Sequence, residues 1–256
     1  MKPRKTKHPA GDKSRLDQLL TSRQLFESRA RARDAILRGT VFVDGAICKK
    51  PGSVTSGDAE IRIDDPARHY VSRAALKLVA GLDHFGFDPR GRTVLDIGAS
   101  TGGFTQVLLE NGVNHVVAVD VGHDQLHPAL RENSRVTSLE GVNARDLTAE
   151  TIGSRPVHAV VSDVSFISLR LALPPALAIA EPGSFCLLLV KPQFEAGRPA
   201  IGKGGIVKNP DDGPRIVKDL SEWLGNQPGW ASLGYCPTPI KGGDGNAEFL
   251  LGGTKS

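Results

Sequence analysis

Hydrophobic and polar positions follow one pattern before residue 64 and another after residue 70. From Arg15 the segment RLDQLL predicts a short helix, which breaks at Thr21 and Ser22. The segment ESRARARDAILRG predicts a second helix over 27–39, with Gly39 at the position that a C-cap glycine takes. The positions that share helical spacing on the second helix are Ala30, Arg33, Ile36 and Leu37.

The next segment, TVFVDGAICKK (40–50), alternates between apolar and polar positions around an Asp-Gly pair. Alternation with Asp-Gly at its centre is a strong signal for a β-hairpin. A further strand is predicted for AEIRI (59–63). Residues 14–63 are therefore expected to form a small α+β domain, followed by a linker at 64–70.

Residues 71–256 alternate between predicted helices and apolar strands. A helix is expected at 71–85, and later helices at 102–111, 168–180 and 211–225. The expected strands are 93–98, 115–120, 135–141, 157–163 and 185–191, with a last one in NAEFLLGG (246–253). Such alternation predicts an α/β fold, a doubly wound, Rossmann-like domain with a mostly parallel sheet covered on both faces.

Charge is unevenly distributed between these two parts. The chain carries a formal net charge of +4. Residues 1–50 hold 13 Lys/Arg and 5 Asp/Glu, a net +8, so the remainder carries −4. This asymmetry indicates an anionic partner, nucleic acid first and a membrane surface second, although a solvated basic arm at 1–13 would give the same excess.

Other compositional features narrow the class of protein. Hydrophobic residues make up 39% of the chain, enough for a substantial core, and the absence of a CxxC pair disfavours a disulfide framework or a cysteine-based zinc site. No apolar stretch follows the basic N-terminus, and no uncharged run reaches the roughly 20 residues of a membrane span. We expect a cytoplasmic protein with no metal site.

The glycine-rich turn after the first strand of the second domain predicts a nucleoside-type ligand. Small residues allow a ligand to approach the backbone, and the following helix offers free N–H groups. Ser100 stands where a dinucleotide fingerprint needs glycine, so the turn matches DxGxSxG, a form common in S-adenosylmethionine-dependent methyltransferases. The second strand ends in Asp120, whose carboxylate can accept both ribose hydroxyls. A tight turn with an ordinary strand-end acid is the alternative.

Two further charged residues follow apolar strands. Asp163 ends VVSD and Lys191 ends LLLVK, so both are expected at the ligand-binding edge of the sheet. Either residue alone could be a solvated strand end. The run Gly197 to Gly204 nearly matches a phosphate-binding loop, but Gly204 replaces the hydroxyl residue that would hold magnesium.

Several motifs in order resemble the TlyA family of ribosomal RNA 2′-O-methyltransferases, also labelled hemolysin A, within the FtsJ-like group. They are SRAALKL, DIGASTGGFT, SDVSFISL, LVKPQFEAGR, GKGGIV and GNAEFL. The segment RLDQLL…SRARARDAILRGTVFVDG is similar to the αL RNA-binding motif of ribosomal protein S-four. Alanine stands at 74 and 75, where family members often have glycine.

The resemblance implies a catalytic tetrad of Lys77, Asp163, Lys191 and Glu248. A ribose 2′-hydroxyl must lose its proton during methyl transfer, and a lysine can accept it when burial and neighbouring cations favour the neutral amine. Lys191 is the expected base and Asp163 its orienting carboxylate. Lys77 would hold the ribose or its phosphate, and Glu248 would position a lysine or the ribose. By helical pattern alone, Lys77 would be a solvated lysine.

The same resemblance implies S-adenosyl-L-methionine as cofactor and ribosomal RNA, in ribosomal subunits, as partner. Expected cofactor contacts are Asp96, Gly98, Ala99, Ser100, Thr101, Gly102, Gly103, Phe104, Asp120, Asn143 and Asp146. Expected RNA contacts are Arg15, Arg23, Arg29, Arg31, Arg33, Arg38, Lys49 and Lys50. Each of these basic residues could instead be an exposed helix or strand charge.

The sequence allows alternative functions for the chain and for one of its segments. A membrane-active hemolysin, an rRNA-binding factor without catalysis, and a nicotinamide-dependent oxidoreductase are the rival functions. Five glycines in 192–214 fit either a loop that gates the substrate or a plain surface loop. The sequence does not determine the target nucleotide, the ribosomal subunit or the oligomeric state. The family resemblance suggests that the nucleotide is a cytidine.

Overall fold

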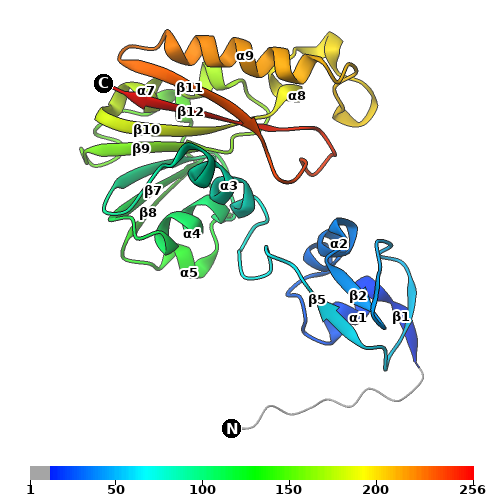
Figure 1. The fold of residues 1–256 in the computed structure, drawn as a ribbon. Helices are drawn as coiled ribbons and strands as arrows, with labels where there is room; N and C mark the ends of the chain where they lie inside the picture. The colour runs from blue at the N-terminus through cyan, green and yellow to red at the C-terminus, as the bar shows by residue number, and fades with distance from the viewer. Residues whose placement is uncertain (1–11) are drawn as a thin grey trace. The chain divides into compact units, whose positions relative to one another are not determined.

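The computed structural model describes residues 12–256, which form two compact units (Figure 1). The division falls between Arg68 and His69, inside the segment expected to be a linker. Most of the expected basic arm, residues 1–11, lies outside the described residues. Each unit is built around its own apolar core.

The small unit combines two helices with short antiparallel strands. Leu16, Leu20, Ile36 and Val41 are buried together in its core. Strands β3, β2 and β5 form one sheet in that order, and β1 pairs with β4. The elements are β1 Lys13–Arg15, α1 Leu16–Ser22, α2 Arg29–Arg38, β2 Val41–Val43, β3 Ala46–Ile47, β4 Val54–Ser56 and β5 Ile61–Ile63.

Two turn predictions in this unit are confirmed. Asp44 and Gly45 join β2 to β3 with φ angles of 50° and 81°, both in the left-handed region that a two-residue hairpin turn requires. Gly39 ends α2 with φ 77°, where residues with a side chain are strained. The cap fixes the direction in which the chain enters β2.

The prediction of which side of the second helix faces the core is wrong, except at Ile36. Ala30 is exposed and Leu37 is 55% exposed, whereas Ala32, Ala35 and Ile36 are buried. The two alanines face the core because α2 packs closely against α1, and a small side chain permits that approach.

The expected limits of the first helix are also wrong. Arg15 belongs to β1, because that strand pairs with β4 through Val54. The helix α1 continues through Thr21 and Ser22, whose hydroxyls donate to carbonyls of the preceding turn. The break between the helices therefore lies at 23–28.

The large unit contains one seven-stranded sheet, in the order β11-β12-β10-β9-β6-β7-β8. Five neighbouring strands, from β10 to β8, are parallel, and β12 and β11 are added antiparallel at one edge. The prediction of a mostly parallel, Rossmann-like sheet is confirmed. The strands are β6 Thr93–Ile97, β7 His115–Asp120, β8 Val136–Glu140, β9 Val157–Ser162, β10 Ala180–Val190, β11 Trp230–Pro237 and β12 Phe249–Lys255.

Helices cover both faces of this sheet (Figure 1). On one face pack α3 Ala75–Phe85, α4 Gly103–Glu110 and α5 Pro128–Arg131. On the other pack α6 Leu169–Ala172, α7 Pro174–Ile179 and α9 Asp212–Gly225. Because alternate strand residues point to opposite faces, runs such as Val116 to Val119 are buried on both sides.

Some element boundaries differ from the sequence predictions. The expected helix at 168–180 is two short helices, because prolines at 174 and 175 begin a new one. The expected helix at 71–85 begins only at Ala75, since the N–H of Val71 donates to Gln106 Oε1 on α4. Strand β11 was not expected, because its segment WASLGYCP has no apolar run and contains a glycine and a proline, and its extended form is stabilised by pairing with β12.

The segment 192–214 is not a structureless loop. It contains α8 Pro192–Glu195, η2 Arg198–Ala200 and η3 Lys203–Gly205. Asn246 joins it to the segment before β12, accepting from the N–H of Val207 and donating to the carbonyl of Gly205, both at 3.0 Å. Within residues 12–256, no helix is long and apolar enough to cross a membrane.

Candidate active site

The turn between β6 and α4 brings backbone close to the end of β9. Gly98 has φ 82°, and a Cβ atom there would lie 3.0 Å from the Cα and N atoms of Val164. Only glycine avoids both the strained angle and the clash with backbone. The turn therefore lies directly against the chain that leaves Asp163.

Asp120, at the end of β7, is oriented by the same turn. Its two carboxylate oxygens accept from the N–H groups of Ser100 and Gly122, each at 2.8 Å. Each carboxylate oxygen can accept more than one hydrogen bond, so both can still bind hydroxyl groups. The carboxylate is thus preorganised next to the turn.

A cavity of about 520 Å³ opens beside these groups. Its volume lies in the range of small-molecule sites. Four of the expected cofactor residues line it, namely Gly98, Ser100, Asp120 and Asn143. Apolar side chains at Val121, Val142, Ile167 and Ala172 complete much of its wall. An apolar cleft with a carboxylate at one side suits a nucleoside.

The remaining expected cofactor residues do not line this cavity. Ala99, Thr101, Gly103 and Phe104 line a small neighbouring pocket of about 60 Å³, which shares Gly98, Ser100 and Asp163 with the cavity. Neither hollow is lined by Asp96, Gly102 or Asp146.

Asp96 lies beneath the turn rather than facing the ligand space. It is fully buried in β6 and accepts from the hydroxyl of Thr105 on α4 at 2.6 Å, while its other oxygen has no partner among the described residues. Burial raises the pKa of Asp96 to about 7, and the nearby charge of Asp163 adds to this.

The raised pKa predicts a stability that falls with rising pH. Between the unfolded pKa near 4 and the folded value near 7, the folded state holds a proton that the unfolded state has lost, so unfolding free energy decreases across this window. Between pH 5 and pH 8 this decrease is about 3 kcal/mol, and we expect Asp96→Asn to remove most of it. Denaturant unfolding of both proteins at pH 5 and pH 8 measures it. Equal pH dependence in the two would contradict it.

The first of two ion pairs joins the ends of β9 and β10. Lys191 Nζ lies 2.7 Å from Asp163 Oδ1, and the two side chains are 12% and 18% exposed. The two neighbouring parallel strands end together, which places both residues at the carboxyl edge. Asp163 also lines the cavity, so the pair adjoins the ligand space.

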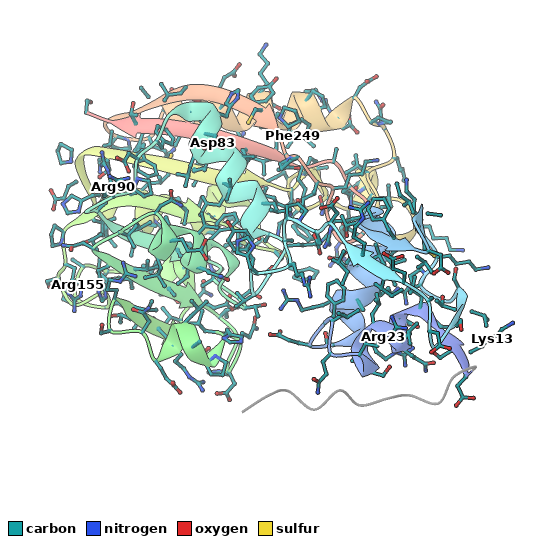
Figure 2. The ribbon with its side chains drawn as sticks, turned by 60° about the horizontal axis from the view of Figure 1, so that its bottom comes forward. Lys13, Arg23, Asp83, Arg90, Arg155 and Phe249 are labelled. Carbon is teal, nitrogen blue, oxygen red and sulfur yellow. The ribbon has the colours of Figure 1, made fainter. Side chains whose placement is uncertain are left out.

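The second ion pair joins Lys77 on α3 to Glu248, which immediately precedes Phe249 at the beginning of β12 (Figure 2 labels Phe249). Both residues are at least 95% buried. The expectation of a solvated Lys77 from helical pattern is therefore wrong. Helical spacing could not reveal the burial, because the segment before β12 covers that face of α3.

The strand register brings the two ion pairs to one place. Val190 pairs with Phe249 in the antiparallel β10–β12 ladder, so continuing by one residue places Lys191 opposite Glu248. Directly opposed residues in such ladders have Cα atoms about 5 Å apart. All four side chains expected to form the tetrad thus lie around the carboxyl ends of β9 and β10.

Sequence reasoning missed several residues of this site. Ser165 and Phe166 line the cavity, and Phe166 is 89% exposed with φ 65°. Gln125 lines it as well, on a loop held by Glu140, which accepts from the N–H groups of residues 124–126. Those N–H groups lower the pKa of Glu140. The position of Glu140 at the end of β8 was a detectable signal, equivalent to that of Asp120.

The basic residues of the small unit divide into two groups. Arg23 donates to the carbonyls of Gly57 and Ala59, and Arg38 pairs with Asp34 and Asp65, so these two arginines hold the unit together (Figure 2 labels Arg23). Arg15 and Arg29 share Asp17 but remain about half exposed, and Arg31 pairs with Glu27. The side chains of Arg33, Lys49 and Lys50 are exposed and form no hydrogen bond or ion pair within residues 12–256.

Comparison with known proteins identifies both units. Residues 70–255 match the family model for FtsJ-like methyltransferases, and residues 14–61 match that for the S4 domain. The chain is 43% identical to a Mycobacterium tuberculosis protein named 16S/23S rRNA (cytidine-2′-O)-methyltransferase TlyA, over 93% of this chain and 89% of that protein. It is 39% identical to Hemolysin A of Brachyspira hyodysenteriae, covering 92% and 98% of the two chains.

A solved structure shows the same arrangement of elements. A Streptococcus thermophilus protein described as a hemolysin is 38% identical, with a TM-score of 0.74, covering 96% of this chain and 90% of that one. The match includes both units.

Proposed function

Because the chain belongs to the TlyA family, with an FtsJ-like methyltransferase domain after an S4 domain, we propose that it methylates the 2′-hydroxyl of a cytidine in ribosomal RNA. The relative named for this reaction matches over most of both chains. Ribosomal RNA, in ribosomal subunits, would be its partner, and the cytoplasm its location. The domain bounds that we propose are 14–63 for RNA binding and 71–256 for methyl transfer, with 64–70 as linker.

Two ion pairs carry the proposal, and one of them includes Asp163 in the wall of the cavity. Lys191 with Asp163, and Lys77 with Glu248, place two amines and two carboxylates at one edge of the sheet. A nucleoside-sized cavity beside them is what methyl transfer to a ribose requires, since the reacting groups must be held in line.

The cavity fits S-adenosylmethionine as cofactor. Asp120 would accept the ribose hydroxyls, Asn143 and the apolar wall would hold the adenine, and the turn from Gly98 to Gly103 would admit the amino-acid end. Gly98 and Ser100 of this turn line the cavity. When bound, the cofactor supplies an activated methyl group.

The protein would then contribute alignment and removal of a proton. Lys191 would accept the proton of the 2′-hydroxyl, while Asp163 holds the amine in position. Lys77, held by Glu248, would place positive charge beside the ribose or its phosphate. Asp96 would support the turn from below, and Asp146 would lie at the adenine side.

A tritium-transfer assay tests the proposal. Purified protein with labelled S-adenosylmethionine and ribosomal subunits lacking the modification should incorporate label into rRNA, and alkaline hydrolysis should leave a resistant dinucleotide, the mark of a 2′-O-methyl group. Label in the base, or none, would contradict it. Leakage of liposomes treated with the same preparation would instead support a membrane-active hemolysin.

The small unit would anchor rRNA through phosphate contacts. Arg15, Arg29, Arg31, Arg33, Lys49 and Lys50 would bind phosphate directly, whereas Arg23 and Arg38 would act by holding the unit together. Arginine forks and lysine amines suit phosphate, and the chain has only 5% aromatic residues for stacking on bases.

Charge reversal separates the two groups of basic residues. We expect Arg33→Glu with Lys49→Glu and Lys50→Glu to weaken rRNA binding and to reduce its salt dependence by about one counterion per lost phosphate contact. Filter binding at several salt concentrations measures the slope. Arg23→Gln is the control, expected to lower the melting temperature with the slope retained. An unchanged slope in the triple variant would refute these contacts.

A further inference from the structure

Ser165 occupies a position that the catalytic tetrad does not account for. Its hydroxyl oxygen lies 2.7 Å from Lys191 Nζ, as close as Asp163 Oδ1. The residue is exposed and lines the cavity, whereas Lys191 is largely buried and is not part of the cavity wall. Ser165 therefore stands between the ligand space and the amine.

Ser165 differs from Asp163, which also lies near Lys191 Nζ, in being able to donate a hydrogen bond. Besides Ser165, Lys191 Nζ lies near two oxygens of Asp163, forming an ion pair with the carboxylate at 2.7 Å and donating to the carbonyl at 3.4 Å. Carboxylate and carbonyl oxygens only accept hydrogen bonds, but a hydroxyl also donates. Ser165 can therefore accept from a lysine ammonium and donate to the neutral amine.

We propose that the hydroxyl of Ser165 relays the proton of the substrate 2′-hydroxyl to Lys191. The inference rests on the proposed function and names one more residue in it. As the 2′-oxygen bonds to the methyl carbon, its proton passes to Ser165 Oγ and the proton of Ser165 passes to Nζ. The electron pair of the broken carbon–sulfur bond stays on sulfur, the serine ends neutral, and the lysine ends as an ammonium.

The site geometry favours this route over direct contact. A methyl acceptor must approach the cofactor held in the cavity, where Ser165 lies exposed in the wall and Lys191, with a side chain 12% exposed, does not line the wall. A relay needs each donor and acceptor within about 3.2 Å, and the serine–lysine contact already meets this.

Single substitutions test the relay. Ser165→Ala should lower kcat about 10²-fold with KM for rRNA unchanged, and Ser165→Thr, which keeps the hydroxyl, should restore kcat to within a few fold. Calorimetric affinity for S-adenosylmethionine should be the same in all three proteins. Ser168→Ala is the matched control, because Ser168 is the N-cap residue before α6 and donates to Glu195 instead of contacting Lys191. It should keep full kcat.

A double-mutant cycle shows whether the serine acts through the lysine. Ser165→Ala combined with Lys191→Ala should be no slower than Lys191→Ala alone, to within about threefold. Additive losses, or failure of threonine to restore kcat, would overturn the relay. If wild-type protein methylates rRNA and Ser165→Ala does so equally well, the inference fails while the proposed function stands. If wild-type protein has no activity, the proposed function itself fails.

Discussion

Lys191→Ala is expected to lower the rate of methyl transfer about 10³-fold, because the 2′-hydroxyl then loses its proton acceptor. Affinity for S-adenosylmethionine should be retained, since Lys191 does not line the cavity. Single-turnover transfer of label to rRNA and calorimetric titration of the cofactor measure the two quantities on the same preparation.

A second substitution distinguishes a base from a fixed charge. Lys191→Arg keeps a cation that can pair with Asp163, but a guanidinium does not lose its proton near neutral pH. We expect this variant to be as slow as Lys191→Ala. Substantial activity in Lys191→Arg would show that only positive charge is needed and would remove the base assignment.

Glu248→Ala is expected to cause the largest loss of stability, about 3–5 kcal/mol, together with loss of activity. The substitution leaves the ammonium of Lys77 buried without its carboxylate, and an uncompensated buried charge is costly. Denaturant unfolding followed by fluorescence of the two tryptophans, both in the large unit, measures the change in unfolding free energy.

Replacing both partners separates stability from function. Lys77→Met with Glu248→Leu removes both charges and keeps similar volume, so the double variant should regain most of the lost stability. The double variant should remain inactive if the ion pair binds or positions the substrate ribose. A stable double variant that methylates rRNA at the wild-type rate would assign the pair a structural role only.

Local patterns predicted the features that depend on a few neighbouring residues. The Asp44-Gly45 turn and the Gly39 cap follow from backbone angles that those residues adopt readily. The parallel strands follow from apolar runs that can only be buried on both faces. Strand β11 escaped prediction because its position depends on pairing with β12 and not on its own composition.

Tertiary contacts determine what local patterns could not predict. Whether Lys77 is buried depends on Glu248, 171 residues further along the chain. Arg23 donates to two backbone carbonyls, whereas the side chain of Arg33 forms no hydrogen bond or ion pair among the described residues. This difference also depends on the neighbours that each residue has in the folded chain. Motif order predicted the tetrad residues and the pairing of Asp163 with Lys191, and the structure shows that Glu248 pairs with Lys77.

The charge asymmetry along the chain takes on a specific meaning in this account. Half of the basic excess in the first 50 positions falls in residues 14–50, within the match to the S4 domain, and the other half in residues 1–13. The acidic remainder of the chain holds the cavity and both ion pairs. The small unit would thus bind the anionic substrate, and the large unit would methylate it.

Mass-spectrometric mapping of 2′-O-methyl groups in ribosomal RNA would show whether this chain methylates rRNA in the cell. Ribosomal RNA from cells that contain the protein should carry a 2′-O-methylcytidine that is absent when the gene is deleted, and absent again when only Lys191→Ala is supplied. Identical maps from cells with and without the protein, or restoration of the modification by Lys191→Ala, would contradict the account.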